Sequence, residues 1–153
     1  MFDERWAEGL RYYWKSHFFD YLSDEAIDTI VEYCDSSAPF MSVFTDGWLS
    51  GAISEMDADV TAFPHRDKAV SLTISMQWED PDRDDELITW AREFHEALEP
   101  YAADGVYVNL LDQDDDERVP EAYGEWYDRL RDLKDKWDPE NLFRLNHNIT
   151  PPD

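Results

Sequence analysis

The sequence is poor in cysteine, lysine and glycine, and it has no long hydrophobic run. Its one cysteine, Cys34, cannot form an internal disulfide bond, and the apolar periodicity around it predicts a small core residue. No window is long and apolar enough to span a bilayer, and no basic segment leads into an apolar stretch at the N-terminus. We therefore expect a cytoplasmic protein. Without repeats or an interdomain linker, the 153 residues predict a single domain over 1–153.

Basic residues are scarce as a class, because 13 Lys and Arg stand against 37 Asp and Glu, a net charge of −24. Nucleic acid and anionic membranes need Lys and Arg to neutralise phosphate, so both are excluded as partners. The acidic excess with only four lysines favours a protein from a halophile, in which counterions screen the self-repulsion. The alternative is a strongly acidic cytoplasmic protein from a non-halophile.

The sequence predicts no metal site. The loop 112–118 begins like a calcium loop, but Glu117 stands where glycine is needed and Tyr123 where the closing glutamate should be. The four histidines show no ligand spacing. They are His17, His65, His95 and His147.

Hydrophobic periodicity predicts alternating strands and helices. Strands are expected at 10–19, 40–44, 70–78 and 105–111, with a turn at Asp46-Gly47. One helix begins after an N-cap at Ser23, a second begins at Asp80-Pro81, and a third carries an apolar stripe through 126–137. This order predicts an α+β fold, in which an antiparallel sheet carries helices packed on one face.

The opposite face of that sheet is expected to be free and polar. In the strand 70–78, Ser71, Thr73 and Ser75 alternate with large apolar residues, and Tyr107 and Asn109 join them from the strand 105–111. A face of Ser and Thr without charge would line a cleft or contact another domain. An ordinary solvated sheet face is the alternative.

The C-terminal residues predict a helix, a residue pair that ends it, and a polar tail. Asp138-Pro139 ends the third helix and starts a short turn, which Leu142 and Phe143 are expected to anchor on a core. The amides of Asn146 and Asn148 then lie in position for hydrogen bonding. A surface tail whose amides bond only water and backbone is the alternative.

Several segments resemble one enzyme family in the same order. AYGEWYDRLRDLKDKWDPENLFRLNHNI is similar to the C-terminal signature of the FAD-linked oxidases of the berberine bridge enzyme family, and RYYWKSHFFDYLSDEAID, GAISEMDADVTAFPHR and GVYVNLL resemble further segments. The resemblance implies the C-terminal part of a substrate domain, over about 10–120, and a berberine-like segment, over about 105–152. In that family, the sheet of the substrate domain covers the flavin. The FAD-binding domain has no counterpart in the chain, so the cofactor implied, FAD, would be held mostly elsewhere.

The resemblance also implies roles for individual residues. Tyr107 matches the tyrosine that faces substrate and flavin and is the catalytic candidate. Thr73 and Leu110 occupy positions where relatives carry a base, a role that neither side chain can fill near neutral pH. The expected substrate-facing set is Ser71, Thr73, Leu110, Arg66 and His65, and the expected cofactor contacts are Asn109, Asn146 and Asn148. Arg66 would bind an anionic substrate or the flavin edge, although a structural salt bridge is the favoured alternative.

The first functional hypothesis is therefore a substrate-domain fragment of an FAD-dependent oxidoreductase, inactive by itself. Its partner would be an FAD-binding domain from the same gene or from a separate chain. The second hypothesis is a truncated or repurposed domain without flavin or catalysis, which would form a homodimer through the polar face. A third, a small-molecule binding protein, rests only on that Ser and Thr face.

Overall fold

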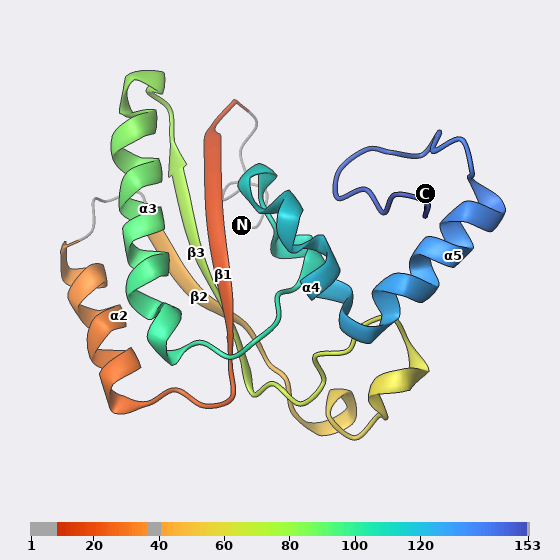
Figure 1. Ribbon diagram of the computed structural model, residues 1–153. Coiled ribbons are helices and arrows are strands. Elements are labelled where there is room, and N and C mark those ends of the chain that lie inside the picture. The colour runs from red at the N-terminus through yellow and green to blue at the C-terminus, as the bar shows by residue number, and fades with distance from the viewer. Residues whose placement is uncertain (1–8, 37–40, 153) are drawn as a thin grey trace.

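The computed structural model describes residues 9–36 and 41–152 and has an α+β architecture (Figure 1). The helices and strands are β1 (Arg11–Phe19), α2 (Asp24–Ser36), β2 (Met41–Trp48), β3 (Val70–Trp78), α3 (Asp84–Leu98), α4 (Val119–Tyr123) and α5 (Tyr127–Trp137). Helices α2 and α3 lie together on one side of the sheet, whereas α4 and α5 lie on the other side of β1 in this view (Figure 1). This confirms the expected fold class. None of the described helices is both long and apolar enough to cross a membrane.

The sheet has three antiparallel strands in the order β1-β3-β2. The central strand β3 has the predicted bounds, and its large apolar side chains enter the core against α3. Asp46-Gly47, predicted as a turn, lies instead inside β2, where the register with β3 shifts between Thr45 and Gly47. A turn signal within a strand commonly marks such a bulge, because glycine tolerates the local kink.

Of the two helices on the covered face, α2 begins as predicted, whereas Asp80-Pro81 starts a 3-10 turn, Pro81–Arg83, that leads into α3 at Asp84. The Ser23 hydroxyl accepts a hydrogen bond from the Ala26 amide at 3.1 Å, and the Asp80 carboxylate accepts one from the Asp82 amide at 3.0 Å. The buried side of α3 consists of Leu87, Ala91, Phe94 and Leu98. The expectation for Cys34 was wrong, because Cys34 is exposed, whereas Ala26, Ile30 and Tyr33 are the residues of α2 that contact the core.

The polar face of β3 is buried, which corrects the prediction of a free face. Ser71, Thr73 and Ser75 are each at most 4% exposed. They lie opposite Phe18, Ser16 and Trp14 of β1 in the antiparallel register. Loop residues cover part of this face, since Leu49, Ile53, Phe63 and Tyr107 surround Ser71. Residues from loops of the same chain therefore cover the Ser71 end of the face that was expected to be free.

The segment 105–111 is not a strand, contrary to its β-rich composition. Only Ala103 pairs with β1, through an isolated bridge to Phe18, and Val108–Leu110 forms a short 3-10 turn. Gly105 has φ +99°, and a Cβ there would stand 2.4 Å from the His65 ring. The chain can therefore pass this close to His65 only with glycine, and the bend prevents the segment from continuing along β1.

The C-terminal helix is interrupted, and its apolar stripe is largely uncovered. Gly124, with φ +50°, separates α4 from a 3-10 turn that leads into α5. Asp138 ends α5 as predicted. Leu142 and Phe143 are 71% and 82% exposed, so the prediction that they anchor the turn on a core was wrong. No residue of α5 itself is buried.

Candidate functional site

A small apolar pocket brings three of the predicted site residues together. It has a volume of about 310 Å³ and contains Tyr107, Arg66 and Ser71. Phe18, Leu49, Ile53 and Phe63 complete its lining. We call it the Tyr107 pocket. β1 and β3 supply its floor, and the loop between β2 and β3 supplies most of its wall, so residues distant in sequence meet at one end of the sheet.

Two neighbours orient the Tyr107 side chain. Its ring meets the Phe63 ring edge to face at 5.6 Å between centroids. Its hydroxyl accepts a hydrogen bond from the Asn109 amide at 2.8 Å. The bond links Tyr107, the N-cap residue of the 3-10 turn, to the second residue within that turn. The phenol oxygen keeps its own hydrogen and a further lone pair for a second partner.

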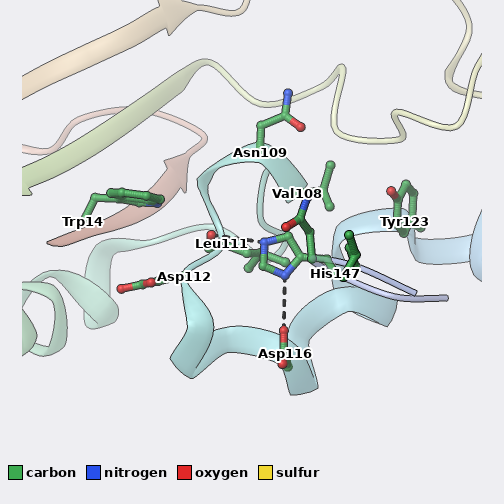
Figure 2. Close-up of a pocket in the computed structure, with 10 residues that line it drawn as sticks. Trp14, Val108, Asn109, Leu111, Asp112, Asp116, Tyr123 and His147 are labelled. Carbon is green, nitrogen blue, oxygen red and sulfur yellow. Dashed lines mark hydrogen bonds and ion pairs between the residues drawn. The ribbon is translucent and has the colours of Figure 1, made fainter. Parts of the chain in front are cut away.

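Asn109 also lines a second and larger cavity, which we call the C-terminal cavity (Figure 2). Its volume is about 830 Å³, and it lies between the 105–112 segment and the C-terminal tail. Asn146 enters this lining from a left-handed backbone conformation, with φ +58°. The hydrogen bond between Asn109 and Tyr107 thus connects the two hollows.

Sequence reasoning missed much of the lining of the C-terminal cavity. His147 Nε2 donates to the Leu111 carbonyl at 3.2 Å, and His147 Nδ1 lies 3.3 Å from a carboxylate oxygen of Asp116 (Figure 2). These contacts fasten the tail over the cavity. Trp14 closes the side nearest the sheet, and its indole Nε1 is buried without a partner. The position of His147 between Asn146 and Asn148 could have indicated a polar site, but sequence spacing alone did not identify Leu111 and Asp116 as its partners.

The other predicted site residues lie outside both cavities. Thr73 is buried in the sheet, and Leu110 is half-buried. Asn148 is also half-buried, with a side-chain oxygen that is enclosed and has no partner. His65 contacts the Phe18 ring, and its Nε2 lies 3.2 Å from the Ala122 carbonyl oxygen, so it ties α4 to β1. Burial lowers the pKa of His65, and its hydrogen bonds to backbone oppose this only in part.

Arg66 makes no salt bridge among the described residues, contrary to the favoured alternative. Its guanidinium donates to the Thr61 hydroxyl at 2.6 Å and to the Ile53 carbonyl at 3.3 Å, and it stacks over Phe63. These bonds fix the loop that forms the wall of the Tyr107 pocket. They also leave the positive charge of Arg66 without a carboxylate partner at the pocket lining.

The polar groups of the C-terminal cavity suit the ring edge of a flavin better than its pyrophosphate. The lining offers two amides, an indole and an imidazole, but it also contains the carboxylates of Asp112 and Asp116 and neither lysine nor arginine. Two carboxylates repel phosphate. Among the residues of ranges 9–36 and 41–152, no group of three or more His, Cys, Asp or Glu is arranged to hold a metal ion.

The chain is similar to one part of longer proteins that are named FAD-linked oxidoreductases or berberine bridge enzyme-like proteins. The chain is 33% identical over 133 residues to the "Uncharacterized FAD-linked oxidoreductase YvdP" of Bacillus subtilis (strain 168), an alignment that covers 86% of this chain and 29% of that protein. It is 32% identical over 134 residues to "Berberine bridge enzyme-like C-1" of Nicotiana tabacum, covering 66% of this chain and 24% of the relative.

Within that class, the chain resembles part of the berberine bridge enzyme family. Residues 106–150 match the family described as "Berberine and berberine like". The crystal structure of berberine bridge enzyme from Eschscholzia californica has the same fold, with a TM-score of 0.83 at 21% identity, over 94% of this chain and 33% of that one. The resemblance seen in the sequence is therefore confirmed. The chain spans between 24% and 29% of the length of the curated relatives cited above.

Proposed function

We propose that the chain is the C-terminal part of the substrate domain of an FAD-dependent oxidoreductase. Joined to an FAD-binding domain, from the same gene or a separate chain, it would roof the flavin and the substrate. In this proposal residues of about 10–120 complete the substrate domain, and the berberine-like segment of about 105–152 returns towards the flavin. The observation that carries it is the Tyr107 phenol, which Asn109 orients between two adjoining hollows on the same side of the sheet.

FAD, when bound, would accept a hydride from an alcohol, amine or sugar carbon of the substrate. The residues of this chain would position the flavin ring and take the proton of the substrate. Asn109 and Asn146, which line the C-terminal cavity, would hydrogen-bond the edge of the flavin ring. In its phenolate form, which the hydrogen bond from Asn109 would stabilise, Tyr107 would take the proton of the substrate hydroxyl or amine, and the apolar walls of the Tyr107 pocket would exclude water from it.

Arg66 supports a preference for an anionic substrate. Its guanidinium lines the Tyr107 pocket and has no carboxylate partner among the described residues, although acidic side chains outnumber basic ones by 37 to 13 in the sequence. A substrate carboxylate near this charge would gain a charge-assisted interaction. His65, Thr73 and Leu110 would act on the site only by supporting its walls.

The setting in which the protein works is also a proposal. The net charge of −24 supports a protein from a high-salt organism, and we retain the cytoplasmic location that the sequence predicts. The non-catalytic alternative predicts that neither flavin binding nor oxidation appears in any complex of this chain.

The test is to co-express the chain with the part of YvdP that it does not match. We expect a yellow complex in which alcohols, amines or sugars bleach the flavin anaerobically, whereas the chain alone binds no FAD tightly. Tyr107→Phe should slow flavin reduction by about 100-fold or more. Tyr101→Phe, at a 37% exposed tyrosine outside both cavities, is the matched control and should leave the rate unchanged. Equal rates for both variants would refute the role of Tyr107.

A further inference from the structure

The bend that precedes Tyr107 is held by a contact with α4. Gly105 permits the bend through its φ of +99°, but glycine does not enforce one conformation, because without a Cβ it has many others available. The Gly105 amide donates a hydrogen bond to Glu121 Oε1 at 3.1 Å. Just before the bend, the Ala103 amide donates to the Phe18 carbonyl of β1 at 2.8 Å. Glu121 therefore fixes the bend between the end that is bonded to β1 and Tyr107.

Arg118 fixes the carboxylate that accepts this bond. Its guanidinium donates to Glu121 through two bonds, from Nε to Oε2 at 2.8 Å and from Nη2 to Oε1 at 3.0 Å. These bonds hold the pKa of Glu121 below its ordinary value, burial opposes them in part, and the bond from the Gly105 amide lowers the pKa further. The Gly105 amide thus meets an ionised carboxylate whose orientation is set by Arg118.

The turn that carries Arg118 is itself anchored on the sheet. Arg118 is the last residue of a 3-10 helix that also contains Asp115. The Asp115 carboxylate accepts a hydrogen bond from Lys15 Nζ of β1 at 2.8 Å, and the two residues are only 9% and 6% exposed. Because this ion pair is buried, it ties the turn firmly to β1, the strand that also supplies part of the floor of the Tyr107 pocket.

Arg118 and Glu121 lie away from the candidate site. Neither residue lines the Tyr107 pocket or the C-terminal cavity. Both line a third hollow instead, with a volume of about 790 Å³, together with Lys15. A direct contact of either side chain with a ligand in the Tyr107 pocket is therefore excluded, and their path to that pocket runs through the Gly105 backbone.

We propose that Arg118 and Glu121 are positioning residues for Tyr107. The Glu121 carboxylate holds the Gly105 amide and so fixes the bend. The fixed bend places the Tyr107 phenol against the Asn109 amide. The inference rests on the proposed function, and it adds to the reaction two residues that touch neither the substrate nor the flavin.

The first test measures anaerobic flavin reduction in the complex of this chain with the part of YvdP that it does not match. Glu121→Ala should slow reduction by about tenfold, because the phenol loses its fixed position. Glu121→Gln keeps an oxygen for the Gly105 amide but has no charge for Arg118, so its rate should fall between those of Glu121→Ala and the wild type. The matched control is Glu86→Ala, which removes a similar pair at the start of α3, in which Arg83 donates at 3.1 and 2.8 Å. Its rate should equal that of the wild type.

A double variant separates positioning from a general structural fault. In the Tyr107→Phe background, Glu121→Ala should slow the remaining reduction by less than about twofold, because the group that Glu121 positions is already missing. A fault that acts on the whole protein would slow both backgrounds by the same factor. Equal factors in the two backgrounds would therefore overturn the inference.

The isolated chain provides a test that needs no flavin. Hydrogen exchange at the Gly105 amide, followed by NMR, should become faster by about tenfold or more in Glu121→Ala. In Glu86→Ala it should stay at the wild-type rate. Unchanged exchange at Gly105 in Glu121→Ala would show that the carboxylate does not hold the bend, whatever the complex does.

The outcomes distinguish this inference from the proposed function. Slow reduction in both Tyr107→Phe and Glu121→Ala, with normal reduction in Glu86→Ala, supports the positioning role. Slow reduction in Tyr107→Phe alone overturns the positioning role and leaves the proposed function standing. A wild-type complex that does not reduce its flavin contradicts the proposed function, and with it a positioning role in that reaction.

Discussion

The stacked histidine pair between β1 and α3 should make the fold sensitive to mild acid. The rings of His17 and His95 lie parallel, with centroids 3.8 Å apart. His17 Nε2 donates to the His95 carbonyl at 2.9 Å, and His95 Nε2 lies 3.3 Å from the Ser16 carbonyl oxygen. Burial, the neighbouring His17 ring and Lys15 lower the pKa of His95 to about 3, while burial also lowers the pKa of His17.

The direction of the pH effect follows from where the proton binds. In the unfolded chain His95 takes up a proton below its ordinary pKa of 6.5, whereas in the folded chain it does so only near pH 3. Between these values the unfolded state binds more protons, so stability falls as the pH is lowered, by about 1.4 kcal/mol per pH unit. Lowering the pH from 6.5 to 5 should therefore cost at most about 2 kcal/mol through His95.

Urea unfolding of the wild type and of His95→Gln at several pH values between 7.5 and 5 measures this contribution. Acidification also relieves repulsion among the carboxylates, so the informative quantity is the difference between the two proteins at each pH. The advantage of the wild type should shrink by about 2 kcal/mol across the range. A difference that is constant with pH would refute the idea that a neutral His95 is required in the folded state.

Three further predictions concern stability. In thermal unfolding, Gly105→Ala should lower the stability by about 3 kcal/mol, because the new Cβ meets the His65 ring. The control Gly9→Ala, also at positive φ but with open space around it, should lower it by only about 1 kcal/mol. Equal losses in the two variants would contradict the steric argument. Lys15→Met should cost about 3 kcal/mol by leaving the Asp115 carboxylate buried without its 2.8 Å partner, and adding Asp115→Leu should recover part of the loss. Raising NaCl from about 0.1 M to about 1 M should raise the melting temperature, since the Debye length falls from about 10 Å to about 3 Å; a decrease would argue against adaptation to salt.

The sequence predicted those elements whose local pattern agrees with their packing. β3 alternates strictly and has the predicted bounds, α2 begins at the predicted cap Ser23, and Asp80 caps the 3-10 turn that leads into α3. The prediction failed where contacts distant in sequence override local preference. The segment 105–111 has the composition of a strand, but its path is set by the approach of Gly105 to His65, a residue 40 positions earlier in the chain. Spacing cannot reveal such a contact.

The candidate site, too, could be predicted from the sequence only in part. Tyr107, Ser71 and Arg66 meet in one pocket, although the orienting hydrogen bond from Asn109 required a turn where a strand was expected. Had 105–111 been a strand, Tyr107 and Asn109 would still have shared a face, but about 6–7 Å apart along it. The observed bond instead joins the N-cap residue of the 3-10 turn, Tyr107, to Asn109 within the turn. The catalytic candidate and its orienting partner consequently depend on the same bend that Gly105 permits.

The exposed C-terminal residues show why burial cannot be predicted from pattern alone. The spacing of Trp126, Leu130, Leu133 and Trp137 marks one face of a helix, yet no residue of α5 is buried within the described chain. A hydrophobic stripe indicates that one face of a helix packs against other residues, but it does not identify those residues. The Leu142 and Phe143 backbone is nevertheless ordered outside the core, because both amides donate to the shielded Asp138 carboxylate, which also pairs with Lys134.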